Sequence, residues 1–448
     1  MPGKPMAVVK PCARLRVSLS TLKPAVKILR LLFPGLVFLV VTASSGLADF
    51  ALRDGDTVAF LGDSITAARG YTKIVEHYTL MRFPERKVRF VNAGKGGDTA
   101  AGCLERLERD VYSQGATVVT VAFGVNDIGW GMKANDESKQ RYLDGLRAII
   151  GQCRAHKVRP IICSAAITAE APDKAENGYL QKMTDEGLAL AKSLGAETVD
   201  LQRGMREAQR KIVAANEKEK DEKKQSRLHV ADGIHLSDLG HLAMAYALLK
   251  GLGAPEDVSS VVIDAGAGAA AEAKGCRVTE IKAVENGLDF TRLDDGLPVT
   301  FGAFSAWDFR WVPVPEGLDR YMLTIKNLPP GEYQISAEGR MLGKASAEHL
   351  ARGLNISGMT ADAWQPGGPW DAQSIAVKEL VDARDKLWNS GQLRRQSLAT
   401  HPQHAPIQES AVKLDDDLVT FQRTLAKPYP YHFSVRKAEP SPPAPPKN

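Results

Sequence analysis

Short apolar segments alternate with amphipathic ones across the first half of this chain, and this alternation restricts the fold more than any other feature. The apolar segments have the length and β-branched content of buried strands, and stretches with helical periodicity lie between them. Strands are predicted at 57–61, 88–92, 117–123, 158–163 and 197–200, with helices at 71–82, 104–112, 139–156 and 179–194. Strands that alternate with helices in this way predict a parallel sheet covered on both faces.

A serine follows the first predicted strand directly, in the tripeptide Gly62-Asp63-Ser64. Active sites of parallel α/β sheets lie at the carboxyl ends of the strands, so the Ser64 hydroxyl is well placed to act as a nucleophile. Alone, the tripeptide is weak evidence, because Gly, Asp and Ser are common turn residues and a serine at such a point is often a helix N-cap.

Three further motifs follow in order: NAGKGGDT at 92–99, GVND at 124–127 and DGIH at 232–235. Together with Gly-Asp-Ser they resemble the four sequence blocks of the GDSL esterases, the SGNH hydrolase superfamily. The resemblance covers residues 54–250, less than half of the chain. It implies an α/β fold for residues 49–253, a flavodoxin-like three-layer sandwich around a five-stranded parallel sheet.

Hydrolysis of an ester through serine requires a nucleophile, a base and a group that orients the base. From their places in the motifs, we expect Ser64 to be the nucleophile, His235 the base and Asp232 the carboxylate that fixes the imidazole. A spacing of three residues lets Asp232 and His235 come from one turn. His229 and His241 lie nearby in the sequence and are predicted to stand outside the catalytic set.

The reaction also requires hydrogen-bond donors for the oxyanion. The resemblance assigns this role to the backbone N–H groups of Ser64 and Gly97 and to the side-chain amide of Asn126. As alternatives, Gly97 only permits a turn and Asn126 only caps the segment that follows it. Turn and capping roles are predicted for the neighbouring Asp63, Asp98 and Asp127.

The N-terminal region carries the basic excess of the chain. All seven charged residues of 1–48 are Lys or Arg, so the rest has 51 basic and 53 acidic residues and no basic footprint for nucleic acid. An uncharged run at 31–43 and the small residues Gly46 and Ala48 are typical of a secretory signal. We therefore expect a signal peptide at 1–48, export to the periplasm or the cell exterior, and no stable membrane insertion after cleavage. An uncleaved N-terminal anchor is the alternative, since the charge-free stretch approaches the length of a membrane span.

The pattern changes beyond Gly253. Strands at 259–264, 277–283, 321–326 and 332–337 and helices at 346–354 and 374–389 predict a smaller accessory α+β region over 254–400. Residues 401–448 are rich in Pro and polar residues and are predicted to form a partly disordered tail. The cysteines Cys103, Cys153, Cys163 and Cys276 allow three complete disulfide pairings, and the sequence does not choose among them.

Two segments resemble cofactor-binding motifs, but neither has all the features that such a motif requires. The run GAGAAA at 266–271 fits a dinucleotide fingerprint, but the helix that would follow it is too short for a crossover on a parallel sheet. Residues 94–97 resemble a phosphate loop without its Gly-Lys-Ser/Thr spacing, and no Gly-x-Ser-x-Gly elbow frames a serine. We expect neither a cofactor nor a metal ion.

The residues therefore predict an exported serine esterase that acts on a small-molecule or polysaccharide ester, with an acetylated carbohydrate as the favoured substrate. Two alternatives stay open. An acyltransferase would use the same residues to move an acyl group onto a glycan hydroxyl. A non-catalytic glycan-binding or envelope protein would work through the region after Gly253. The acyl chain, the alcohol and the oligomeric state are not defined by the sequence.

Overall fold

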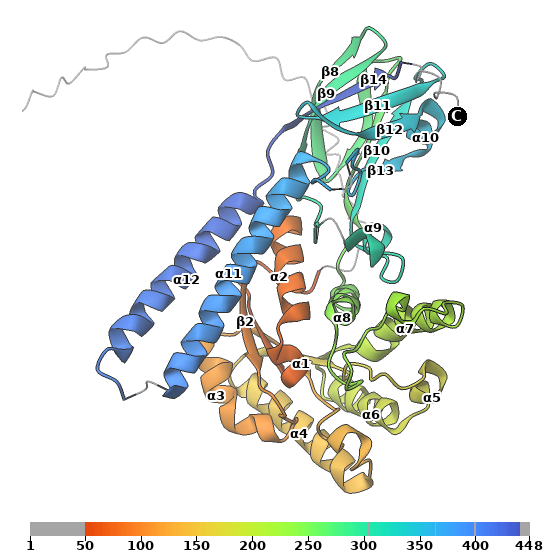
Figure 1. The fold of residues 1–448 in the computed structure, drawn as a ribbon. Coiled ribbons are helices and arrows are strands. Elements are labelled where there is room, and N and C mark those ends of the chain that lie inside the picture. The colour runs from red at the N-terminus through yellow and green to blue at the C-terminus, as the bar shows by residue number, and fades with distance from the viewer. Residues whose placement is uncertain (1–49, 303–304, 363, 398–399, 440–448) are drawn as a thin grey trace, which may run out of the picture. The chain divides into compact units, whose positions relative to one another are not determined.

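The five strands predicted in the first half of the chain form one sheet. The computed structural model describes residues 50–302, 305–362, 364–397 and 400–439 (Figure 1). The strand order of this sheet is β2-β1-β3-β4-β5, and every pairing is parallel. The strands are β1 (Thr57–Gly62), β2 (Arg89–Gly94), β3 (Val118–Ala122), β4 (Arg159–Cys163) and β5 (Glu197–Val199). This is the flavodoxin-like order, and the predicted five-stranded parallel α/β fold is confirmed.

Helices cover both faces of this sheet because successive strand residues point to opposite sides. In β1, Val58 and Phe60 join one apolar core, whereas Ala59 and Leu61 join a second one. The first core takes in residues of α2, α7 and α8, and the second takes in residues of α4 and α6. The helices of this part are α1 (Ser64–Ala67), α2 (Gly70–Arg82), α3 (Leu107–Asp110), α4 (Asp136–Ala155), α5 (Pro172–Glu176), α6 (Tyr179–Ser193), α7 (Leu201–Asn216) and α8 (Asp238–Gly251).

Two more sheets follow α8 in the described part of the chain, with strand orders β13-β10-β6-β7 and β12-β11-β14-β9-β8. The α+β character predicted for this region is therefore confirmed. In the run GAGAAA, residues 266–268 lie in the turn between β6 and β7, and the last three alanines begin β7. The first core continues into this region and includes Phe290, Trp370 and Phe433. The strands are β6 (Asp257–Asp264), β7 (Ala269–Lys274), β8 (Cys276–Val284), β9 (Gly287–Asp294), β10 (Arg320–Lys326), β11 (Glu332–Ala337), β12 (Arg340–Ser346), β13 (Leu354–Asn355) and β14 (Tyr431–Lys437). The short helices are α9 (Val314–Gly317) and α10 (Ala347–Arg352).

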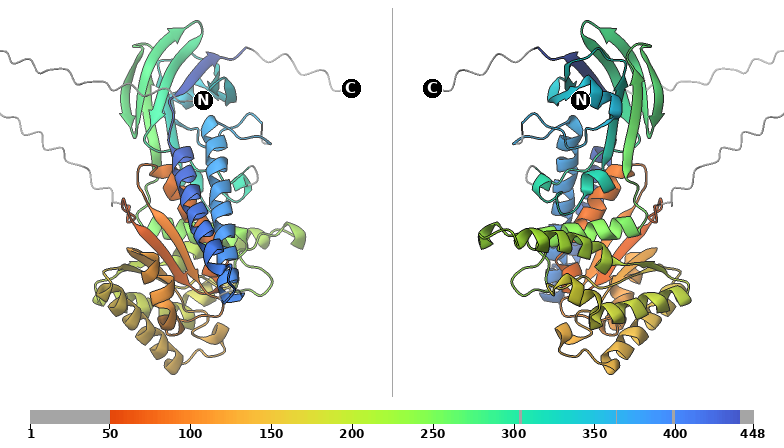
Figure 2. Two further views of the ribbon diagram at one scale, coloured as in Figure 1. Left: turned by 90° about the vertical axis from the view of Figure 1, so that its left-hand side faces the viewer. Right: turned by 90° about the vertical axis from the view of Figure 1, so that its right-hand side faces the viewer.

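Two long helices, α11 (Pro369–Ser397) and α12 (His404–Ala426), lie side by side against α2 (Figures 1 and 2). Strand β14 then enters the middle of a sheet, between β11 and β9. The prediction of a partly disordered tail is therefore wrong over α12 and β14. The prolines that led to this prediction lie at positions where a helix or strand tolerates proline. Pro402 and Pro406 lie around the start of α12, and Pro428 and Pro430 lie just before β14. Residues 440–448 lie outside the described ranges.

Residues 1–49 also lie outside the described ranges, and with them the signal peptide predicted at 1–48. Within those ranges, no helix combines the length and apolar character that a membrane crossing requires. Cys103, Cys153, Cys163 and Cys276 are all buried and unpaired.

Candidate active site

Ser64 stands at the carboxyl edge of the first sheet, as the first residue of α1. The preceding Gly62 ends β1, and a Cβ at that position would collide with the Thr66 hydroxyl, so glycine lets α1 begin immediately above the strand. Asp63 caps the helix, because its Oδ1 accepts the Ile65 N–H at 2.9 Å. The strand, the glycine and the cap together fix the place of the serine.

His235 bridges Ser64 and Asp232. Its Nε2 lies 2.8 Å from Ser64 Oγ, and its Nδ1 lies 2.6 Å from Asp232 Oδ2. An ionised carboxylate can only accept hydrogen bonds, so Nδ1 carries the imidazole proton and Nε2 presents a lone pair to the Ser64 hydroxyl. The structure thus brings together the three residues that the sequence singled out, with the hydrogen-bond polarity that a serine nucleophile requires.

The turn that carries Asp232 keeps this carboxylate ionised. Its Oδ1 accepts the backbone N–H of Ile234 at 2.8 Å and that of His235 at 2.9 Å. The hydrogen bond from the His235 side chain, together with these two backbone bonds, lowers the pKa of Asp232 to about 2. Asp232 therefore carries its negative charge throughout the pH range in which ester hydrolysis is measured.

The two other histidines of this region lie outside the Ser64–His235–Asp232 set. His229 is buried beneath the turn, with its Nε2 3.0 Å from the Ile167 carbonyl oxygen, and burial lowers its pKa. His241 is buried in α8, and its Nδ1 accepts the Tyr71 N–H at 3.3 Å. Burial lowers the pKa of His241 to about 4. Both are neutral histidines that support the surrounding backbone.

The backbone N–H groups of Ser64 and Gly97 have no protein acceptor among the described residues. Gly97 lies beyond the end of β2, next to β1 in the sheet, and has a left-handed φ of 72°. A Cβ there would meet no atom within 4 Å, so the backbone conformation, and not crowding by protein, favours glycine. Both N–H groups are available to an incoming oxygen.

Asn126 lies beyond the end of β3, on the other side of β1. One hydrogen of its Nδ2 is donated to the Asp98 carbonyl oxygen at 3.0 Å, and its Oδ1 accepts the indole N–H of Trp130 at 2.8 Å. An amide has two N–H groups, so one remains for a ligand. The contact with Asp98 joins the loop of Asn126 directly to the loop of Gly97.

Arg106, which sequence reasoning did not single out, ties these loops to the nucleophile strand. Its buried guanidinium pairs with Asp98 at 2.6 Å and donates to the carbonyl oxygens of Ala93 at 2.6 Å and Gly62 at 3.1 Å. The helix predicted at 104–112 is accordingly interrupted: a 3₁₀ turn ends at Arg106, and the short α3 follows. In the sequence Arg106 looks like any arginine on a helix surface, and only its contacts in the folded protein reveal its role.

Of the three aspartates beside the site, Asp63 has the predicted capping role. The prediction is wrong for the other two, because Asp98 forms the buried ion pair with Arg106 and Asp127 holds the loop that follows β2. Asp127 Oδ1 accepts the Ala100 N–H at 3.0 Å, while its buried Oδ2 has no partner among the described residues. Burial raises the pKa of Asp127 to about 7 and that of Asp63 to about 6.

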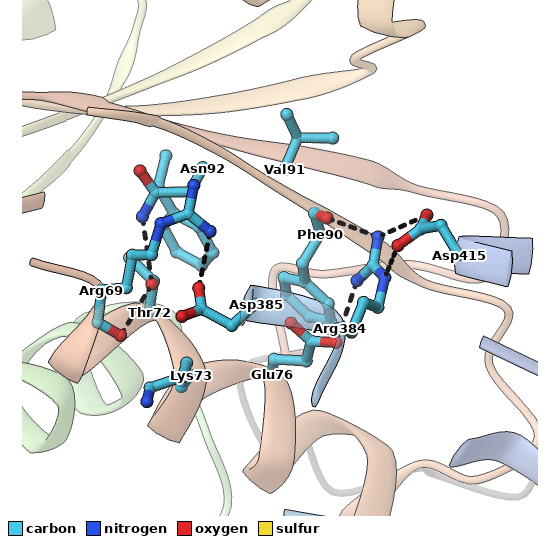
Figure 3. A pocket seen from close by; sticks show the side chains of 11 residues that line it. Arg69, Thr72, Lys73, Glu76, Phe90, Val91, Asn92, Arg384, Asp385 and Asp415 are labelled. Atoms are coloured by element: carbon cyan, nitrogen blue, oxygen red, sulfur yellow. Dashed lines mark hydrogen bonds and ion pairs between the residues drawn. The ribbon is translucent and has the colours of Figure 1, made fainter. Parts of the chain in front are cut away.

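Helices α11 and α12 are held against the first sheet by buried charges (Figure 3). Arg384 of α11 donates to Glu76 of α2 at 3.0 Å, to Asp415 of α12 at 2.7 Å and to the Phe90 carbonyl oxygen at 2.9 Å. Gln422 of α12 donates to the same Glu76 at 3.1 Å. Arg384, Glu76 and Asp415 border a cavity of about 30 Å³, large enough for a water molecule. One arginine thus joins both C-terminal helices to the helix and strand that follow the nucleophile.

Comparison with known proteins identifies the family of this site. Residues 60–243 match the GDSL-like Lipase/Acylhydrolase family. An acetylxylan esterase of Geobacillus stearothermophilus is 25% identical over 227 residues, which are 45% of this chain and 96% of that protein. The uncharacterized lipoprotein YqeF of Bacillus subtilis (strain 168) is 30% identical over 134 residues, 28% of this chain. The match spans 54%, about half, of the length of that lipoprotein.

A solved structure resembles much more of the chain. It is that of a gut microbial diltiazem-metabolizing enzyme, with a TM-score of 0.73 and 22% identity, and it covers 86% of this chain and 98% of its own. At this identity the likeness shows the fold alone. Because the match extends well past α8, the C-terminal sheets and helices are part of a shared architecture.

Proposed function

Residues 60–243 make this chain a member of the SGNH hydrolase superfamily and a serine ester hydrolase, and from this premise we propose that it removes short acyl groups, acetyl above all, from carbohydrate esters. The observation that carries the proposal is the hydrogen-bonded series Ser64–His235–Asp232, with distances of 2.8 and 2.6 Å. The similarity to an acetylxylan esterase over nearly its whole length supports the substrate class.

In the proposed reaction, Ser64 Oγ attacks the ester carbonyl carbon while His235 Nε2 takes the hydroxyl proton. Charge that develops on the carbonyl oxygen is met by the N–H groups of Ser64, Gly97 and Asn126. His235 then returns the proton to the departing alcohol, and an acyl-enzyme remains. Water, deprotonated by His235, attacks this acyl group and releases the acid and the free Ser64 hydroxyl.

Exposure of the site supports hydrolysis over transfer of the acyl group to a second alcohol. About a third of the surface of each of the His235 and Asp232 side chains is open to solvent, so water reaches the acyl-enzyme readily. A site of this kind also admits an ester carried on a large alcohol such as an oligosaccharide. We further propose that the protein acts outside the cytoplasm, on small-molecule or polysaccharide esters, from the secretory pattern of residues 1–48.

The test is release of acetate from acetylated xylo-oligosaccharides by the purified protein, beside the hydrolysis of p-nitrophenyl acetate and p-nitrophenyl palmitate. We expect acetate release, a preference for the acetyl over the palmitoyl ester, and loss of both activities in Ser64→Ala. A palmitate preference would contradict the short-acyl assignment. Acyl transfer to added glycan in excess of acid release would contradict hydrolysis.

A further inference from the structure

Trp130 is held in a backbone conformation that a large side chain rarely adopts. Its φ of 58° lies in the left-handed region, between Gly129 at 52° and Gly131 at 95°. Among the described residues other than glycine with positive φ, it is the only aromatic one. Such conformations persist where the surrounding structure enforces them, and they concentrate at functional sites.

This strained turn does not bury the indole. Half of the Trp130 surface, 50%, is exposed, so the side chain contributes little to the core. Its ring lies nearly perpendicular to the His235 imidazole, with an interplanar angle of 80° and centroids 5.9 Å apart. An exposed, rigidly held aromatic ring therefore stands beside the base.

The same indole fixes the side chain of Asn126. Its Nε1–H donates to Asn126 Oδ1 at 2.8 Å, while Asn126 Nδ2 donates to Asp98. Both ends of the amide are thus held, which determines the direction of the remaining N–H. Trp130 therefore has two contacts with the site: its exposed indole faces the space for the alcohol part of the ester, and its N–H holds Asn126, a donor for the oxyanion.

We propose that Trp130 forms the sugar-binding surface of the site, where the indole receives the C–H face of a pyranose ring that carries the acetyl ester, and that it positions Asn126. A pyranose ring presents an apolar face with hydroxyls at its edge, and a flat indole offers matching contact area at low entropic cost because its backbone is already fixed. The proposal rests on the function proposed above and defines how the carbohydrate is recognised.

Two variants separate the two roles. Trp130→Phe keeps a ring but loses the N–H, so kcat should fall about tenfold for a sugar acetate and for methyl acetate alike, with KM little changed. Trp130→Leu also removes the ring, so KM should rise a further tenfold or so for acetylated xylotriose only. Methyl acetate is the reference because it has no ring to stack. Phe421→Leu, which removes another exposed aromatic residue, on α12, is the control and should match wild type.

Binding is measured separately by tryptophan fluorescence in the inactive Ser64→Ala protein. Acetylated xylotriose should change the emission of Ser64→Ala and leave that of Ser64→Ala/Trp130→Phe unchanged. Trp130→Gly is the control for misfolding, because glycine adopts the left-handed conformation without strain. This variant should unfold at or above the wild-type temperature and still show the raised KM for acetylated xylotriose.

The proposal is overturned if Trp130→Leu affects both esters equally, or if both Ser64→Ala proteins show the same fluorescence change. If wild type hydrolyses neither ester, the proposed function fails, while the fluorescence titration still decides whether Trp130 binds the sugar.

Discussion

The Arg69 guanidinium lies 2.6 Å from the Asp385 carboxylate, so a side chain of α11 holds a residue only five positions after the nucleophile (Figure 3). Arg69 has a left-handed φ of 66° and precedes α2. Its N–H donates to the Thr66 carbonyl oxygen, and its own carbonyl oxygen accepts the Thr72 hydroxyl. The C-terminal helices therefore support the turn that joins the helix of Ser64 to α2.

Removal of the Asp385 charge should disturb this turn. In Asp385→Asn the Arg69 charge, on a side chain that is 8% exposed, loses its partner, and we expect a loss of about 3 kcal/mol in the free energy of unfolding and a lower kcat for methyl acetate. Denaturant unfolding and initial rates measure both. Asp416→Asn is the matched control: this carboxylate is 56% exposed in its pair with Arg89, and its loss should cost under about 1 kcal/mol. Equal effects of the two substitutions would contradict a specific role for Asp385.

Asn126→Ala should lower kcat by about 10²–10³ with little change in KM, because one oxyanion donor is lost while ground-state contacts remain. Asn126→Asp should be no better, since a carboxylate offers no N–H. Steady-state kinetics with methyl acetate decide the matter. A fall of less than about threefold in kcat would remove Asn126 from the set of oxyanion donors.

Arg106 should be essential for holding the loop of Gly97 and the end of β1 in place. Arg106→Met leaves Asp98 charged and buried without its partner, at a cost of about 3–5 kcal/mol in the free energy of unfolding. The double variant Arg106→Met/Asp98→Asn removes that isolated charge and should regain part of the stability without regaining kcat, because the bonds to the Gly62 and Ala93 carbonyl oxygens stay broken. Recovery of full kcat in the double variant would show that Arg106 serves only to neutralise Asp98.

Stability should depend on pH through Asp319. Burial raises the pKa of this carboxyl to about 8, and its Oδ1 accepts the Val299 N–H at 3.0 Å. The folded protein keeps a proton that the unfolded chain releases near pH 4, so this contribution to stability falls as pH rises from about 4 to 8, by at most about 1.4 kcal/mol per pH unit. Asp319→Asn, which stays neutral, should flatten the dependence and raise stability at pH 8. Thermal unfolding at pH 5 and pH 8 tests this, and an unchanged pH dependence in the variant would refute it.

The sequence predicts the first sheet and the Ser64–His235–Asp232 set because these depend on local patterns: apolar strands separated by helices, and short motifs that carry the three residues. Arg106 and Trp130 could not be found in this way. Arg106 contacts β1, β2 and the loop after β2, and no local pattern predicts these contacts. The position of Trp130 depends on a left-handed turn that the residue pattern does not predict. Prolines near the starts of α12 and β14 made this region resemble a disordered tail. Strand β14 is also stabilised by strands far away in the sequence.

The most direct test of the serine mechanism is the mass of the intact protein, quenched in acid during turnover of p-nitrophenyl acetate. This activated ester acylates quickly, so an acyl-enzyme should accumulate. We predict a wild-type protein that carries one acetyl group, mapped by peptide analysis to Ser64 and lost once the ester is consumed, and a Ser64→Ala protein that carries none and does not turn over. Wild-type turnover without acetylated Ser64, or turnover retained in Ser64→Ala, would contradict a nucleophilic role for this serine.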